Sequence, residues 1–286
     1  MKEDQIQEAT VSVIIPTSGR FELLPRALES LVNSQLKPTE VIIVTDSSIR
    51  EAEQELESIR SAYSHRLENM VFIHSSGPSG AAATRNAGLQ FVSSDYVAFL
   101  DDDDEFLPEK LTIQLQEMIA TESVFSFSDY FRVSPSETTY ADCSPKPKHN
   151  GDLAREISFD SCRIATPTVV VSSKILTQLA PLFPEDMTLR EDNYAWLRIA
   201  LTNNFRYVHI SQALAKVNLE GASLQRPDDV KKMKPTPLIT KEERKILSLA
   251  RSGGLRAPFM HALRISTFRT LVLAVQAFRR RWPKKE

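Results

Sequence analysis

The first hundred residues alternate between short apolar segments and longer amphipathic ones. The apolar segments predict buried strands, because they are short, continuous and rich in β-branched residues. These segments are Val11–Pro16, Val41–Val44, Val71–His74 and Tyr96–Leu100. The segments between them carry apolar residues at helical spacing, at about residues 21–35, 50–62 and 81–92. Such an alternation predicts an α/β fold with a mixed, mostly parallel sheet, right-handed crossovers and helices on both faces.

A run of acidic residues, Asp101–Glu105, follows the fourth predicted strand directly. A buried strand cannot hold such a run, so it must lie past the carboxyl end of the strand, where open α/β sheets bind ligands. Adjacent carboxylates favour either full solvation or a cation between them. Mg²⁺ typically takes one or two carboxylates together with substrate phosphates. An exposed acidic turn is the simpler reading of the run alone, and the strand before it favours a metal–diphosphate site.

Other polar residues follow the predicted strands at the same edge, namely Thr17–Arg20, Asp46 and, after the third strand, Gly77–Gly80 and Arg85. The loop Gly77–Gly80 enters a helix and resembles an anion-binding helix N-terminus. It fits neither the Rossmann nor the P-loop pattern, so an ordinary glycine turn is the alternative. We expect these loops to converge on the aspartates.

The second half of the chain is less regular. It predicts strands at 123–127, 166–171, 205–210 and 213–219, an exposed loop at 133–152 and a helix at 173–179. A further helix carries Glu191 and Asp192 in its first turn, where the helix dipole favours negative charge. The two acids are either helix caps or include a general base that faces the sheet edge. Arg198, later in this helix, is expected to be structural.

Charge is distributed unevenly along the chain. Residues 231–286 carry a net charge of +12 and the remaining residues a net of −14, which gives the overall −2. We expect a globular domain at residues 1–220, a linker at 221–240 and a basic amphipathic helical tail at 241–286. The tail suits an anionic membrane surface, or it docks on the acidic domain. Nothing in its composition supports binding to nucleic acid.

The two cysteines, Cys143 and Cys162, form no CxxC pattern, which supports neither a zinc site nor a disulfide framework, although one disulfide between them stays open. The N-terminus has no apolar signal segment, and no run is long enough to span a bilayer. We therefore expect a cytoplasmic protein, with peripheral contact at the inner face of the membrane if the tail binds there.

Five segments, taken in order, resemble motifs of the family 2 glycosyltransferases with the GT-A fold, over about residues 11–220. They are Val11–Thr17, Val41–Asp46, Ala83–Gly88, Phe99–Asp104 and Glu191–Arg198. Three features depart from the family pattern. Thr45 stands where an aspartate is frequent, Ser18 and Gly19 replace a common Tyr-Asn pair, and residues 217–223 lack a histidine often found there.

The resemblance implies transfer of a sugar, with inversion, from a nucleotide-diphosphate sugar to an acceptor hydroxyl. A UDP-sugar is the expected donor, a glycan or lipid-linked molecule the expected acceptor, and surface polysaccharide synthesis the expected setting. Asp101 and Asp103 would hold Mg²⁺ or Mn²⁺, Asp192 would be the catalytic base, and Glu191 would position the acceptor. The residues implied to contact the nucleotide-sugar are Pro16, Thr17, Arg20, Asp46, Arg85 and Asp102. The alternatives are a non-catalytic nucleotide-sugar binder and a nucleotidyltransferase, which would need a glycine-rich loop after the first strand.

Overall fold

A computed structural model describes most of the first 219 residues. The described ranges are 8–46, 49–77, 79–145, 153–158, 164–186, 191–202 and 205–219. The predicted linker and basic tail, at 221–286, lie outside them, as do Cys162 and Pro78. Cys143 is buried.

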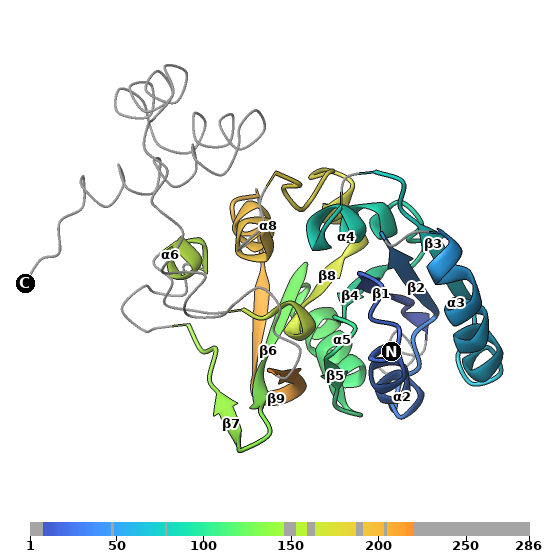
Figure 1. The fold of residues 1–286 in the computed structure, drawn as a ribbon. Helices are drawn as coiled ribbons and strands as arrows, with labels where there is room; N and C mark the ends of the chain where they lie inside the picture. Colours follow the sequence, from blue (N-terminus) through green and yellow to red (C-terminus); the bar gives the residue numbers. More distant parts are fainter. Residues whose placement is uncertain are drawn as a thin grey trace, which may run out of the picture. The chain divides into compact units, whose positions relative to one another are not determined.

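The strands of the described residues form one sheet in the order β3-β2-β1-β4-β8-β6-β9-β5, with β7 paired to β6 (Figure 1). The strands are β1 Val11–Thr17, β2 Glu40–Thr45, β3 Met70–His74, β4 Tyr96–Phe99, β5 Glu105–Phe106, β6 Phe125–Val133, β7 Thr138–Ala141, β8 Val170–Ser172 and β9 Tyr207–Asn218. The helices are α2 Leu24–Val32, α3 Ile49–Tyr63, α4 Ala81–Leu89, α5 Lys110–Thr121, α6 Leu153–Ser158, the 3₁₀ turn η2 Thr166–Thr168, α7 Ser173–Leu176 and α8 Glu191–Ala200.

Most of these strands point in one direction. Strands β1 to β4 are mutually parallel. Strand β8 is antiparallel to both β4 and β6, so β6 regains the direction of β4, and β9 runs parallel to β6. The carboxyl ends of β1–β4, β6 and β9 therefore meet at the same edge of the sheet, which confirms the predicted mixed, mostly parallel sheet.

Helices cover both faces of the sheet, as the sequence predicts. On one face, α2, α3 and α5 share a buried core with alternate residues of β1, β2 and β4, such as Val13, Val41 and Ala98. On the other face, α4 comes so close that a Cβ at Gly88 would lie 2.8 Å from a methyl carbon of Ile14. Helix α8 also packs on this second face through ring contacts of Trp196.

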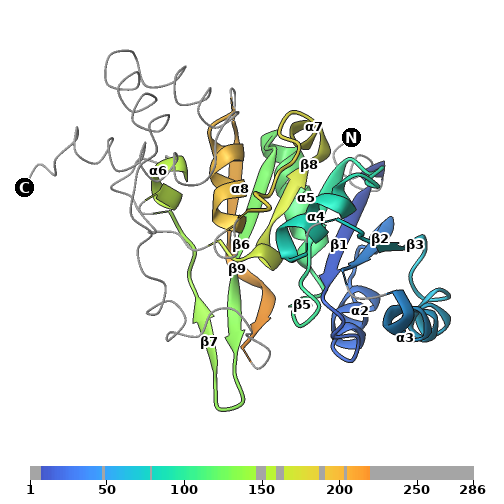
Figure 2. The same ribbon diagram turned by 45° about the horizontal axis from the view of Figure 1, so that its top comes forward.

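Beyond residue 100 the structure differs from the prediction in five places. The two predicted strands at 205–210 and 213–219 are one strand, β9, whose register against β6 shifts twice near Asp129. The predicted loop at 133–152 contains strand β7, and Figure 2 shows the β6–β7 hairpin extending beyond the neighbouring strands. The predicted strand at 166–171 begins as the turn η2. Short helix α6 and the two-residue strand β5 were not expected at all.

Candidate active site

The acidic loop after β4 is fixed by the last residue of β9. The backbone N–H of Asn218 donates to Asp104 Oδ1 at 2.8 Å, and the Asn218 side-chain amide donates to the carbonyl of Asp103 at 2.7 Å. Asp104 is buried, and burial together with the charge of Asp101 raises its pKa well above the usual range. Asp104 is therefore a structural residue of the loop. Its neighbours Asp101, Asp102 and Asp103 contact arginine side chains instead.

Arg20, from the loop after β1, pairs with two of these neighbours. Its guanidinium pairs with Asp102 and donates to Asp103 Oδ2 at 3.0 Å. The Asp102 side chain is almost fully buried, and burial raises its pKa to about 6 even though Arg20 opposes this effect. Asp103 keeps some exposure. The structure thus brings together three residues that the resemblance assigns to the donor site.

Arg85, in the middle of α4, joins the two halves of the domain. Its guanidinium donates to Asp101 Oδ1 at 2.6 Å and to Glu191 Oε1 at 3.0 Å, and it lies over the Phe183 ring. The arginine is almost fully buried. Asp101 and Glu191 are 90 positions apart in the sequence, so this one side chain brings the predicted metal side and the predicted acceptor side to one place.

Among the described residues, the charges of this cluster do not balance. The guanidinium groups of Arg20 and Arg85 face four carboxylates, those of Asp101, Asp102, Asp103 and Glu191. Two negative charges remain in excess, which is the charge of one divalent cation. In the described part of the chain no three acidic, histidine or cysteine side chains are grouped to hold a metal ion alone. The excess negative charge fits a divalent cation that phosphate oxygens of a substrate also hold.

Asp192 lies in the first turn of α8, beside this cluster. Burial and the neighbouring Glu191 raise its pKa to about 6, against the opposing effect of Arg85. Its Oδ1 accepts the backbone N–H of Asn193 at 2.7 Å, and the hydroxyl of Thr166 donates to its Oδ2 at 3.4 Å. A partly exposed carboxylate with a pKa near neutrality has the properties of a general base.

Two side chains hold the segment that leads toward α8. Asn86, next to Arg85, donates to the carbonyl of Phe183 at 2.7 Å and accepts the Phe183 N–H at 3.0 Å. Arg198 donates to the carbonyls of Leu179 and Leu182, both at 2.9 Å, in keeping with the structural role expected for it. Asn86 therefore fixes the backbone at Phe183.

A buried polar chain supports the turn that carries Thr166. Lys110 is fully buried and donates to Gln114, whose amide donates to Ser126 Oγ at 2.9 Å and to the carbonyl of Thr168 at 3.0 Å. Burial lowers the pKa of Lys110 well below its usual range. Helix α5 is in this way connected to η2 and, through Thr166, to Asp192.

The remaining predicted nucleotide residues lie at the ends of β1 and β2. Pro16 and Thr17 are the last residues of β1, paired with Val44 and Thr45, and both are buried. Asp46 follows β2 and accepts the backbone N–H of Gly80 at 2.8 Å. The start of α4, predicted to bind an anion, therefore holds a carboxylate of the protein itself.

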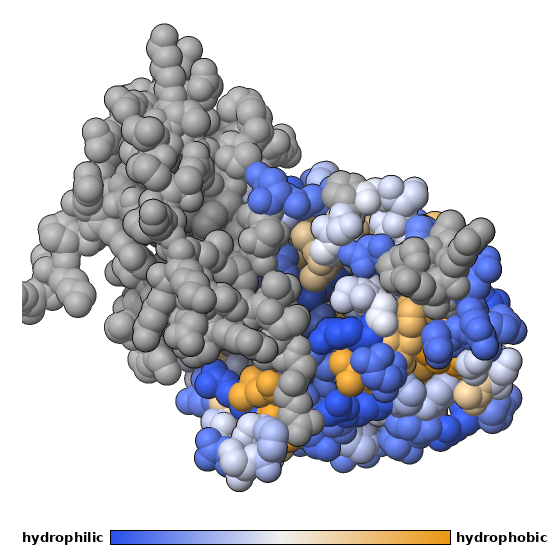
Figure 3. Space-filling view, viewed as in Figure 1, coloured by the Kyte–Doolittle hydropathy of each residue, from blue (hydrophilic) through white to orange (hydrophobic). Residues whose placement is uncertain are grey.

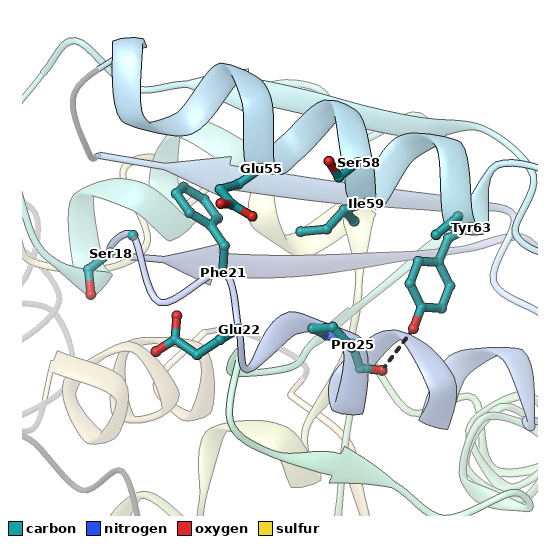
Figure 4. Close-up of a pocket in the computed structure, with 10 residues that line it drawn as sticks. Ser18, Phe21, Glu22, Pro25, Glu55, Ser58, Ile59 and Tyr63 are labelled. Carbon is teal, nitrogen blue, oxygen red and sulfur yellow. Dashed lines mark hydrogen bonds between the residues drawn. The ribbon is translucent and has the colours of Figure 1, made fainter.

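A groove of about 740 Å³ opens between α2 and α3, beside the loop that carries Arg20 (Figure 4). The Tyr63 hydroxyl donates to the carbonyl of Pro25 at 3.4 Å across it. The groove contains none of the acidic residues described above. It is lined by Ser18, Gly19, Phe21, Glu22, Pro25, Glu55, Ser58, Ile59, Ala62 and Tyr63.

The surface around these elements is mainly hydrophilic (Figure 3). No helix among the described residues combines the length and the apolar character that crossing a membrane requires.

Solved structures with this fold are glycosyltransferases of the GT-A class. TarS of S. aureus in complex with UDP-GlcNAc matches with a TM-score of 0.62 and 18% identity, over 94% of this chain and 79% of TarS. A mannosyltransferase from Pyrobaculum calidifontis in complex with GDP-Man and Mn²⁺ matches with a TM-score of 0.55 and 14% identity, over 96% of this chain and 76% of that protein. At these identities the likeness establishes the fold.

The sequence comparisons identify the family. The family model described as "Glycosyl transferase family 2" matches residues 12–171, more than half of the chain. The chain therefore belongs to glycosyl transferase family 2, as the motifs predict.

Two relatives illustrate the range of similarity. An uncharacterized glycosyltransferase of Rickettsia bellii is 30% identical over 221 residues, which cover 77% of this chain and 30% of that protein. The chain spans about a third of the length of its first Rickettsia relatives. The Escherichia coli protein WfgD, named a UDP-Glc:alpha-D-GlcNAc-diphosphoundecaprenol beta-1,3-glucosyltransferase, is 23% identical over 214 residues, covering 75% of this chain and 79% of WfgD.

Proposed function

We propose that this protein is an inverting glycosyltransferase that moves a sugar from a UDP-sugar to a hydroxyl of a glycan or lipid-linked acceptor, in the synthesis of surface polysaccharide. The observation that carries the proposal is the contact of Arg85 with both Asp101 and Glu191. Through this contact Asp192, a partly buried carboxylate of raised pKa, lies beside an acidic loop that has an excess of negative charge among the described residues. Inverting transfer needs such a base on the acceptor side.

On the donor side, Asp101 and Asp103 would hold Mg²⁺ or Mn²⁺ together with the diphosphate. When bound, this cation neutralises the charge that develops on the departing nucleotide diphosphate. Arg20, which contacts Asp102 and Asp103, would bind the phosphates. Thr17 and Asp46 would contact the nucleotide. The diphosphate and cation of the solved complexes, UDP-GlcNAc on TarS and GDP-Man with Mn²⁺ on the mannosyltransferase, support this assignment.

On the acceptor side, Asp192 takes the proton of the attacking hydroxyl, which forms the new bond to the anomeric carbon as the bond to the diphosphate breaks. Inversion follows because attack and departure occur on opposite faces of the sugar. Glu191, held by Arg85, orients the acceptor. The lipid-linked acceptor in the name of WfgD supports an acceptor of that kind here, reached by a cytoplasmic enzyme at the inner face of the membrane.

The test is release of nucleotide diphosphate from a panel of nucleotide-sugars with Mn²⁺, using a membrane lipid extract as the acceptor source. Asp192→Ala should lower acceptor-dependent release at least about a hundredfold, as expected for loss of a general base. Asp103→Ala should lower it and also weaken binding of Mn²⁺ in the presence of UDP. Glu117→Ala, on the exposed side of α5, is the matched control and should change neither.

Three outcomes would contradict the proposal. If Asp192→Ala and Asp103→Ala both release nucleotide diphosphate as fast as the unaltered protein, neither residue takes part in the reaction. Donor binding without any transfer would favour the non-catalytic binder. Release of pyrophosphate from a nucleoside triphosphate and a sugar phosphate would favour the nucleotidyltransferase.

A further inference from the structure

Few large hydrophobic side chains are strongly exposed on the described surface. They are Phe91, Tyr140 and Leu219, with Tyr140 the most exposed at 53%. Tyr140 lies in β7, on the hairpin that extends beyond the neighbouring strands (Figures 1 and 2). An exposed ring normally samples several rotamers unless its neighbours hold it.

The ring of Tyr140 is held at both ends. Its hydroxyl donates to Asp129 Oδ2 at 2.5 Å, and its ring packs edge-on against Phe131, the residue opposite it in β6, at 5.8 Å between centroids. Asp129 is itself buried and fixed by the backbone N–H of Cys143 at 2.7 Å and by His209 Nε2 at 2.9 Å. The bond to Asp129 raises the pKa of Tyr140 to about 12, so the hydroxyl remains a donor at neutral pH.

The topology places this ring at the same edge as the acidic loop. Strand β6 runs in the direction of β4, so the β6–β7 hairpin projects from the carboxyl edge of the sheet. Tyr140 of β7 is paired in register with Phe131 of β6, which is paired with Lys216 of β9. Lys216 is in turn paired with Glu105 of β5, the last residue of the acidic run. Three strand spacings separate Tyr140 from Glu105, which is about 14 Å.

The ring also lies on the face of the sheet that carries α8. A continuous series of contacts runs from Trp196 of α8 to Phe125, then to Phe127 and His209, and so to Asp129. Tyr140 thus shares both an edge and a face with the helix that presents Asp192. Figure 3 shows hydrophobic atoms interrupting the hydrophilic surface near the carboxyl ends of β6 and β9.

We propose that Tyr140 is a stacking platform for a pyranose ring of the acceptor, bound at least one sugar away from the ring that receives the new bond. The apolar C–H face of a pyranose packs on an exposed aromatic ring, and a ring fixed in advance loses little conformational entropy on binding. The separation of about 14 Å from Glu105 favours an acceptor ring beyond the one that receives the new bond. This inference rests on the proposed function, since it assigns the acceptor an extended glycan.

The test is binding of free sugars, measured by saturation-transfer NMR on the full chain. The probes are the disaccharides chitobiose and cellobiose. A separate titration with UDP and Mn²⁺ measures the affinity of the donor site. Tyr140→Ala should weaken disaccharide binding about three- to tenfold, the range expected for one aromatic contact. Phe91→Ala is the matched control, because Phe91 is 51% exposed but follows α4 at the opposite edge of the sheet, and it should change nothing.

A second variant separates the ring from its hydroxyl. Tyr140→Phe keeps the ring and loses only the bond to Asp129, so it should retain most of the binding. The inference is overturned if neither disaccharide binds the unaltered protein, if Tyr140→Ala behaves like Phe91→Ala, or if Tyr140→Phe binds as weakly as Tyr140→Ala. Absence of disaccharide binding by the unaltered protein, with normal UDP affinity and transfer, would contradict only this inference. Normal sugar binding without transfer would contradict only the proposed function.

Discussion

Asp192→Asn should make the protein more stable at neutral pH while it removes the activity. The folded protein raises the pKa of Asp192 from 3.8 to about 6, mainly by burial. A folded pKa above the unfolded one means that the contribution of this group is fully present below about pH 4 and is lost as the pH rises through 6. A difference of about 2 pKa units corresponds to about 3 kcal/mol at pH 7.

Asparagine has nearly the same shape as aspartate and carries no charge, so it avoids this cost. Its side-chain oxygen can still accept the N–H of Asn193, and the Thr166 hydroxyl can turn to accept from its amide. The free energy of unfolding should therefore rise by up to about 3 kcal/mol at pH 7, and by only about 0.5 kcal/mol at pH 4.

Urea unfolding followed by circular dichroism at several pH values measures both quantities. Glu117→Gln makes the same change of charge at an exposed site and should leave stability nearly constant at every pH. A gain for Asp192→Asn that is equal at pH 4 and pH 7, or no gain at all, would refute the assignment of a buried, destabilising carboxylate.

Three further predictions concern the surroundings of this residue. The kcat/KM of transfer should fall about tenfold per pH unit below about pH 6, as Asp192 becomes protonated. A pH–rate profile measures this fall, and a fall that begins only near pH 4 would contradict the raised pKa. Asn86→Ala leaves the backbone N–H and carbonyl of buried Phe183 without their partner, which should cost about 3 kcal/mol in urea unfolding and lower kcat by displacing α8. Gly88→Ala would force its Cβ against Ile14 and should lower the free energy of unfolding by about 1–3 kcal/mol, whereas an unchanged midpoint would mean that α4 moves away without cost.

The first half of the fold could be predicted because its pattern is local. Each of β1 to β4 is a continuous apolar run, each helix has its own periodicity, and the alternation alone implies parallel strands. The convergence of Arg20, Arg85 and the aspartates follows from that topology, since every loop lies after a strand of the same direction. The contacts between these residues, with each arginine bridging two carboxylates, depend on side-chain geometry that no spacing encodes.

The second half could not be predicted in the same way, because its strands depend on distant partners. Strand β5 exists only through its pairing with β9, more than a hundred residues later. Residues Thr138–Ala141 are polar and form β7 only because β6 offers an edge. Asn218 and Asn86 are missed for the same reason: each is an ordinary polar residue in the sequence, and the groups that it binds are known only from the fold. The position of Asn86 beside Arg85 in a motif is the one available signal.

The bonds from Asn218 to the acidic loop have a consequence for the order in which the protein is made. The loop is translated more than a hundred residues before the asparagine that anchors it. A nascent chain that has emerged only as far as β8 already contains every proposed donor-side residue, yet the aspartates lack their anchor. Competence to hold the donor should then appear abruptly, when β9 leaves the ribosome and inserts between β6 and β5, rather than growing with chain length.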